Sequence, residues 1–187
     1  MKLIKMEKIK DGIYLKNYEL TYLNKQNKEK IFELVSRKNL ETPEDIGKKP
    51  SGVSIVAYKD GKMLLLREFR MSLNKSIYNL CAGMIDPEET IEDCLARELY
   101  EETGLSIKNI ISILPPSYSA VGFSDTSTYI AFIEAEGEFE DHTSANEKIV
   151  ANFYSKEEVR ELLKTEDFSS RSQIIAHFFC RTNASIL

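Results

Sequence analysis

The chain has 187 residues, of which 42% are hydrophobic and 29% are charged, and its formal net charge is −5. This length suits one domain with a full core, so we predict a single domain over residues 1–187. No apolar run approaches the roughly 18 residues of a membrane span, no signal-peptide block opens the chain, and no basic block marks a nucleic-acid surface. We therefore expect a cytoplasmic protein that binds neither membranes nor nucleic acids.

The N-terminal part of the chain predicts a β-hairpin. Residues 9–24 are rich in Ile, Tyr and Leu, and residues 30–38 alternate between apolar and polar side chains. A polar turn at 24–28 joins the two segments. Residues 40–51 are polar and contain two prolines, which predicts a connecting loop.

A second hairpin is predicted at the start of the main sheet. The apolar segments 53–58 and 63–69 lie on either side of Asp60-Gly61. This pair tolerates the positive φ that tight hairpin turns require at both central positions.

The segment that follows predicts an amphipathic helix over residues 90–103. Apolar side chains recur there at helical spacing and form one stripe: Ile91, Cys94, Leu95 and Leu99. Thr90 followed by Asp93 resembles a capping box, and Gly104 is suited to end the helix.

The rest of the chain predicts alternating strands and loops, followed by two helices. A strand at 105–114 is expected to end at Pro115-Pro116, because proline lacks the N–H that a strand donates. Further strands are predicted at 128–134 and 148–154, with a long acidic loop at 134–148. Helices are expected after the capping box of Ser155 and Glu158 and over 170–180, with Ile174, Ile175, Phe178 and Phe179 on one side. The three cysteines lack CxxC spacing, which predicts reduced thiols.

Three carboxylates crowd the last turns of the helix predicted at 90–103. Glu98, Glu101 and Glu102 stand at i, i+3 and i+4 and so share one face. Carboxylates near a helix C-terminus cost about 0.3 to 1 kcal/mol each. A bound Mg²⁺ or Mn²⁺ would remove this conflict, since both prefer oxygen ligands. From the spacing alone, a solvated acidic helix face is the alternative interpretation.

The surrounding residues resemble the Nudix box at every fixed position. Gly83, Glu89, the run Arg97-Glu98-Leu99, the pair Glu101-Glu102, and Gly104-Leu105 stand at the required separations over 23 residues. The resemblance implies an α/β fold, a Nudix-type α/β/α sandwich with a mixed sheet. It also implies hydrolysis of a nucleoside diphosphate linked to another group, assisted by divalent cations.

The resemblance also implies roles for particular residues. Glu98, Glu101, Glu102 and the carbonyl of Ala82 would be metal ligands, and Arg97 with Glu89 would brace the loop and orient the glutamates. Glu101, Glu102 and Arg97 are therefore candidate catalytic residues. Glu147 in the acidic loop matches the position of a general base, although a solvated loop glutamate is an equal alternative and His142 could act as a base by its chemistry. Arg70 is the expected phosphate contact.

The N-terminal hairpin resembles the extra antiparallel β-sheet of the ADP-ribose pyrophosphatase branch of the family. The resemblance implies that residues 1–45 form a β extension used in a homodimer, and that Phe32, Glu33 and Arg37 contact substrate. Phe32 as a core residue is the alternative. ADP-ribose, cleaved to AMP and ribose 5-phosphate, is the leading substrate.

Three departures from that branch leave the substrate open. Val121 stands where a proline is typical, Asn79 where glutamate is frequent, and Cys81 where proline is usual. Another nucleotide sugar or a dinucleotide is therefore an alternative substrate. A ligand sensor without hydrolysis is the alternative from a different class of protein.

Overall fold

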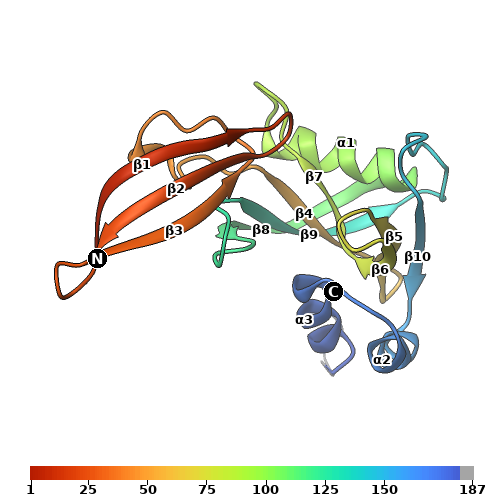
Figure 1. The fold of residues 1–187 in the computed structure, drawn as a ribbon. Helices are drawn as coiled ribbons and strands as arrows, with labels where there is room; N and C mark the ends of the chain where they lie inside the picture. The colour runs from red at the N-terminus through yellow and green to blue at the C-terminus, as the bar shows by residue number, and fades with distance from the viewer. Residues whose placement is uncertain (182–187) are drawn as a thin grey trace. The chain divides into compact units, whose positions relative to one another are not determined.

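The computed structural model describes residues 1–181 and divides into two units, each with its own core (Figure 1). The first unit holds residues 1–51 and 116–129, and the second holds residues 52–115 and 130–181 of the described chain. Organisation as a single domain with a β extension at 1–45 stays a prediction.

The first unit contains a three-stranded antiparallel sheet. Its strands, in spatial order, are β1 (Lys2–Asp11), β2 (Lys16–Leu23) and β3 (Glu29–Ser36). The predicted N-terminal β-sheet is thus confirmed, but it has one strand more than the predicted hairpin. The turn that separates β1 from β2 is closed by the N–H of Gly12 on the carbonyl of Leu15 at 3.0 Å. Residues 9–24 are therefore not one strand. A single 3₁₀ turn, η1 (Pro43–Asp45), lies in the predicted loop.

The second sheet has seven strands, and five of them come from the predicted segments, whereas β6 and β7 were not predicted. Its main path runs β10-β5-β4-β9-β8, with β6 paired to β5 and β7 paired to β4. The strands are β4 (Gly52–Lys59), β5 (Lys62–Arg70), β6 (Lys75–Asn79), β7 (Cys81–Met84), β8 (Ser106–Tyr118), β9 (Ser127–Glu136) and β10 (Ile149–Tyr154). Asp60 and Gly61 have φ of 51° and 73°, as the predicted β4–β5 hairpin requires.

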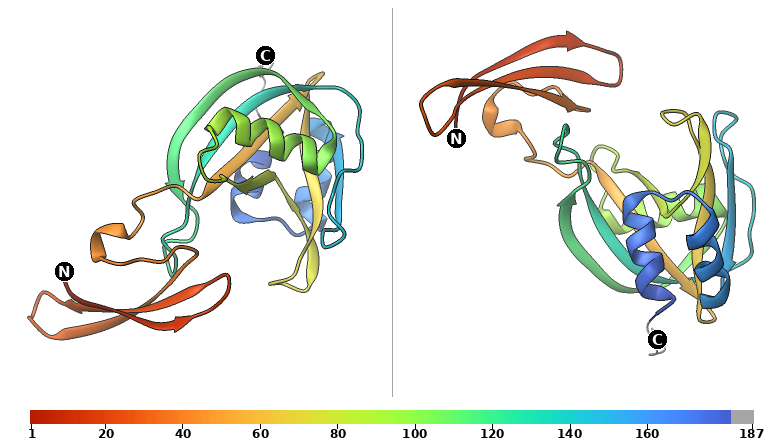
Figure 2. Two further views of the ribbon diagram at one scale, coloured as in Figure 1. Left: turned by 90° about the horizontal axis from the view of Figure 1, so that it is seen from above. Right: turned by 60° about the horizontal axis from the view of Figure 1, so that its bottom comes forward.

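Helices cover both faces of this sheet. They are α1 (Ile91–Thr103), α2 (Lys156–Thr165) and α3 (Ser170–Phe179). Helix α1 packs on β7 and β4, whereas α2 and α3 lie on the opposite face (Figures 1 and 2). There Val159, Ala176 and Phe179 join the core formed by strand residues such as Tyr58 and Leu65. The predicted α/β/α sandwich with a mixed sheet is confirmed. Within residues 1–181, no helix is long and apolar enough to cross a membrane.

One local prediction is wrong, and a second holds only in part. Strand β8 does not end at Pro115 but continues through Pro115-Pro116 to Tyr118. It is the last strand on its side of the sheet, where a residue without an N–H is tolerated.

Helix α3 buries only part of the predicted apolar side, because Phe179 is buried and Ile175 packs against the core but the other two residues are exposed. Ile174 and Phe178 are 55% and 65% exposed, while Ala176 and Phe179 are buried. Ser172 is also fully buried, and its hydroxyl accepts the N–H of Leu80 at 3.1 Å, so small residues occupy much of the side of α3 that faces the sheet.

Candidate active site

Helix α1 carries the candidate site and begins and ends as its sequence predicts. The Thr90 hydroxyl accepts the N–H of Asp93 at 3.1 Å and caps the first turn. Gly104 ends the helix with a φ of 76°, and its N–H donates to the carbonyl of Tyr100 at 2.7 Å. These two caps fix which residues occupy the last turns, and those residues include Glu98, Glu101 and Glu102.

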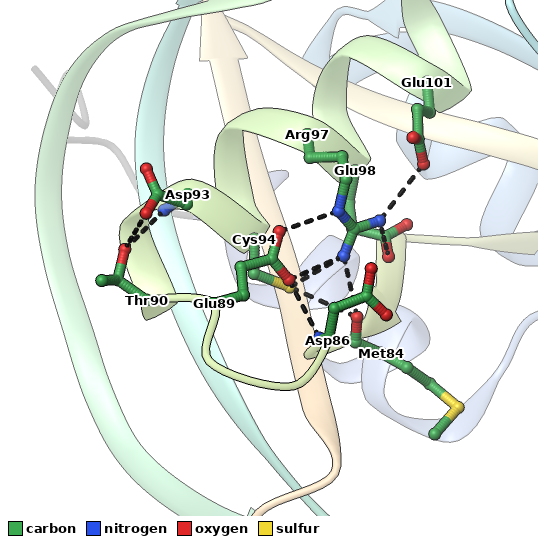
Figure 3. A network of polar contacts seen from close by, with 9 residues as sticks. All are labelled: Met84, Asp86, Glu89, Thr90, Asp93, Cys94, Arg97, Glu98 and Glu101. Carbon is green, nitrogen blue, oxygen red and sulfur yellow. Dashed lines mark hydrogen bonds and ion pairs between the residues drawn. The ribbon is translucent and has the colours of Figure 1, made fainter.

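Arg97 connects the preceding loop to the glutamates of α1 (Figure 3). Its Nε and Nη2 donate to the two carboxylate oxygens of Glu89 at 2.8 and 2.9 Å, and Nη2 also donates to the carbonyl of Met84 at 2.9 Å. Its Nη1 contacts Glu98 Oε1 at 2.8 Å and Glu101 Oε2 at 3.2 Å. One guanidinium therefore holds the loop and two glutamates together. These hydrogen bonds, with a further one from the N–H of Asp86, lower the pKa of Glu89 to about 2.

Gly83 on β7 lies directly beneath the Glu98 side chain. A Cβ at Gly83 would stand 1.7 Å from the carboxyl carbon of Glu98 and within 2.0 Å of both its oxygens. Because real Cβ contacts do not approach so closely, only glycine lets the Glu98 carboxylate lie against the strand. Burial there raises the pKa of Glu98 above its ordinary value, although Arg97 opposes the shift.

We expect Gly83→Ala to lower turnover about a hundredfold, because the added methyl group displaces the Glu98 carboxylate by about an ångström or more. Steady-state kinetics with a Mg²⁺ titration would measure this loss. Gly122→Ala is the control, since a Cβ at Gly122 meets nothing within 4 Å and its φ is not positive. A Gly83→Ala variant that is as active as the wild type would contradict the role given to Glu98.

Glu102 contacts the sheet at the end of the helix. Its Oε2 accepts the N–H of Ala82 at 3.1 Å. Burial raises the pKa of Glu102 to about 8, with smaller contributions from the charges of Glu68 and Glu98. Burial, followed by the charge of Glu102, also raises the pKa of the Cys81 thiol. The site therefore holds more negative charge than its surroundings readily accommodate.

This excess of charge, carried by hard oxygen donors, fits a divalent cation. The predicted ligands Glu98, Glu101 and Glu102 lie on one helix, and Ala82 is hydrogen-bonded to the last of them. They are not gathered into a coordination shell, because Glu98 and Glu101 contact Arg97. Among residues 1–181, no three His, Cys, Asp or Glu side chains are placed to hold a metal ion. The assignment of these ligands stays a prediction.

The loop after β9 is attached to the end of α1. The N–H of Glu140 donates to the carbonyl of Thr103 at 3.0 Å, and the rings of Tyr100 and His142 stack with their centroids 4.4 Å apart. A cavity of about 190 Å³ lies between this loop and the helix, and Glu102 lines it. The predicted base Glu147 is exposed, and its carboxylate accepts the N–H of Ser144 at 3.1 Å.

The remaining predicted substrate residues lie in separate units. Arg70, at the end of β5, contacts Glu68 at 3.2 Å in the second unit. Phe32 and Glu33 lie on β3 in the first unit, where both are exposed, and the exposed Arg37 follows that strand. Phe32 is 39% exposed and so is not a core residue of this chain.

Glu68 is a site residue that no motif in the sequence indicates. This residue is only 6% exposed, although it carries a carboxylate. The signal that could have identified it is a charged residue within an apolar strand, two positions before Arg70.

A mixed sheet between helices, with a glutamate-bearing helix clamped by an arginine, is the arrangement expected of a Nudix domain. A family model described as the NUDIX domain matches residues 48–178. The chain belongs to the Nudix family.

Named relatives match just under half of the chain. The ADP-ribose pyrophosphatase of Saccharomyces cerevisiae is 38% identical over 87 residues, which cover 45% of this chain and 37% of that protein. The ADP-ribose pyrophosphatase of Bacillus subtilis is 33% identical over 91 residues, which cover 48% and 49% of the two chains. This chain thus spans less than half the length of either relative.

A solved structure extends the likeness in fold to nearly the whole chain. The crystal structure of an ADP compounds hydrolase matches 96% of this chain and 91% of its own, with a TM-score of 0.74 and 18% sequence identity. At this identity the likeness concerns the fold alone.

Proposed function

We propose that this protein hydrolyses the pyrophosphate bond of a nucleoside diphosphate sugar, with ADP-ribose as the leading substrate and AMP and ribose 5-phosphate as products. The observation that carries the proposal is the Arg97 network, which joins Glu89, Glu98 and Glu101 within a complete Nudix box. Two relatives named ADP-ribose pyrophosphatase support the choice of substrate.

In the proposed reaction, water attacks one phosphorus of the diphosphate and the bond from that phosphorus to the bridging oxygen breaks. The bridging oxygen leaves on the other phosphate, and Glu147 takes the proton that the water loses. Arg70 would hold phosphate oxygens through its guanidinium. Mg²⁺ or Mn²⁺, when held by Glu98, Glu101, Glu102 and the carbonyl of Ala82, would neutralise charge that develops on the phosphates.

Phosphate release from a panel of substrates, measured with a coupled phosphatase, tests the proposal. The panel includes ADP-ribose, other nucleotide sugars and dinucleotides, each with and without Mg²⁺. We expect Mg²⁺-dependent turnover with ADP-ribose preferred. Preference for another member would redirect the substrate assignment, in keeping with Val121 and Asn79. Tight binding of ADP-ribose without turnover would instead favour a ligand sensor.

The identity of the base gives a second test. We expect Glu147→Gln to lower kcat about a hundredfold, since general bases typically contribute at least this much. His142→Ala should keep kcat within about threefold, because the backbone hydrogen bond from Glu140 to Thr103 still attaches the loop to α1 when the ring contact with Tyr100 is lost. Steady-state kinetics at saturating substrate separates the two, and the reverse pattern would make His142 the base.

The proposal also includes a homodimer that uses residues 1–45, with Phe32, Glu33 and Arg37 in contact with substrate. Light scattering coupled to size exclusion, on the full chain and on a variant altered at Phe32, would test it.

We place the protein in the cytoplasm, where the free thiols of Cys81, Cys94 and Cys180 would remain reduced.

A further inference from the structure

Glu68 is a buried carboxylate at the end of β5, next to the candidate phosphate contact. Its residue is 6% exposed, whereas its neighbours Arg67 and Phe69 are exposed. A carboxylate is costly to bury unless it is paired and hydrogen-bonded. Glu68 has two partners on the same oxygen: Asn79 Nδ2 donates a hydrogen bond to Oε1 at 2.6 Å, and Arg70 Nη1 forms an ion pair with it at 3.2 Å.

Asn79 is held in the orientation that Glu68 requires. In the register of β5 and β6, Asn79 faces Leu66 and Ile77 faces Glu68, so Glu68 and Asn79 are diagonal neighbours. The hydroxyls of Ser169 and Ser172, at the start of α3, both donate to Asn79 Oδ1 at 2.7 Å. With its oxygen occupied by two donors, the amide presents its NH₂ group to Glu68, which accepts.

A glutamate at position 79 would be incompatible with this cluster. It would place a second carboxylate against Glu68, and two carboxylates at hydrogen-bond distance repel each other unless one is protonated. The amide at 79 and the acid at 68 therefore form a matched pair, and the negative charge of the pair lies on the strand that carries Arg70.

We propose that Glu68 is a positioning residue that orients the Arg70 guanidinium for the substrate diphosphate, an inference that rests on the proposed function. The Arg70 side chain is 50% exposed, and a long exposed side chain samples many rotamers when nothing holds it. The contact from Nη1 to Glu68 restricts those rotamers, while the other donors of the guanidinium can turn toward phosphate. Ser169, Ser172 and Asn79 form the support behind Glu68.

The direction in which KM changes in Glu68→Gln distinguishes a positioning role from simple charge repulsion between Glu68 and the substrate. If Glu68 positions Arg70, Glu68→Gln weakens the charge-assisted contact and raises KM for ADP-ribose about tenfold, with kcat within about twofold. If Glu68 only adds negative charge near an anionic substrate, the same variant lowers KM. A lower or unchanged KM would overturn the proposal.

A double-mutant cycle with Arg70→Ala tests whether Glu68 acts through Arg70. We expect Glu68→Gln to have no further effect on KM once Arg70 is alanine, since coupled residues are not additive. An equal rise in KM in both backgrounds would overturn the proposal. Glu161→Gln is the control for charge, because that carboxylate is 71% exposed on α2.

A double variant shows whether a change in KM arises from a loss of stability. Glu68→Gln combined with Asn79→Asp exchanges the amide and the acid between the two positions, so the hydrogen bond between the strands is kept but its direction is reversed, with the side chain at 68 now donating to the one at 79. This double variant should unfold at the wild-type temperature and still show the raised KM, because Arg70 has lost its partner. Wild-type KM in this folded variant would refute the proposal.

Direct binding separates failure of this inference from failure of the proposed function. Calorimetric titration of ADP into the protein in EDTA needs neither metal nor turnover. If the wild type does not hydrolyse ADP-ribose but Glu68→Gln binds ADP about tenfold more weakly, the proposed substrate is wrong and the positioning role stands. Equal affinities for ADP would remove the positioning role.

Discussion

Replacing Glu102 with glutamine is expected to lower kcat at least about a hundredfold while the fold is retained. The amide keeps the shape of the side chain and can still accept the N–H of Ala82, but it cannot supply a negative charge to a cation. Turnover at saturating Mg²⁺ and circular dichroism would measure the two effects. A variant that stays fully active, or one that unfolds, would contradict the role proposed for Glu102.

The same variant should change how stability depends on pH. Burial raises the pKa of Glu102 from 4.5 to about 8. Between these two pH values the carboxyl group is protonated in the folded state and ionised in the unfolded state. The stability from this proton is fully present below about pH 4.5 and is lost as pH rises through 8. We expect the metal-free wild type to lose roughly 3 to 4 kcal/mol of unfolding free energy between about pH 5 and 8 relative to Glu102→Gln. Denaturant titrations in EDTA at both pH values would measure the difference.

Removing Arg97 is expected to have an effect of similar size on turnover. Arg97→Ala leaves Glu89, Glu98 and Glu101 without their shared partner and frees the loop at Met84. We expect at least about a hundredfold loss in kcat/KM and a lower melting temperature, because the oriented carboxylates separate. Arg97→Lys should recover part of the stability and little of the activity, since an ammonium cannot form the paired contact with Glu89.

Arg160→Ala is the matched control for the loss of an arginine. Arg160 also bonds a carboxylate, that of Glu157 at 2.9 Å, but it lies on α2 and its side chain is 46% exposed. Activity at the wild-type level in Arg160→Ala, together with the loss in Arg97→Ala, would assign the effect to the network rather than to general destabilisation. Equal losses in the two variants would contradict that assignment.

The sequence predicts features whose causes are local. Helix α1 is bounded by Thr90 and Gly104, whose capping chemistry acts within four residues. The β4–β5 turn depends only on Asp60 and Gly61, which adopt the positive φ expected of that pair. The residues of the Nudix box also lie within one segment. Arg97 and Glu89 are only eight residues apart, so their contact can be predicted from the spacing of the box.

The sequence does not predict features that depend on distant segments. The separation of β1 from β2 is an exception, because its turn is local and the pair Asp11-Gly12 is the signal that could have predicted it. The burial of α3 depends on its approach to the sheet rather than on the size of Ile174 and Phe178. In the Glu68 cluster, Asn79 lies 11 residues from Glu68, and Ser169 lies 90 residues from Asn79. No pattern within any of these segments indicates that the three side chains are in contact.

The prolines within β8 affect how the protein behaves at high concentration. An outer strand exposes N–H and C=O groups that can pair with a strand of another molecule, and this pairing is the first step of many aggregates. Pro115 and Pro116 remove two consecutive N–H donors from β8, the last strand on its side of the sheet. Their rings also obstruct the approach of a second chain. The same dipeptide that is tolerated at this edge therefore helps to keep the sheet from growing into intermolecular assemblies.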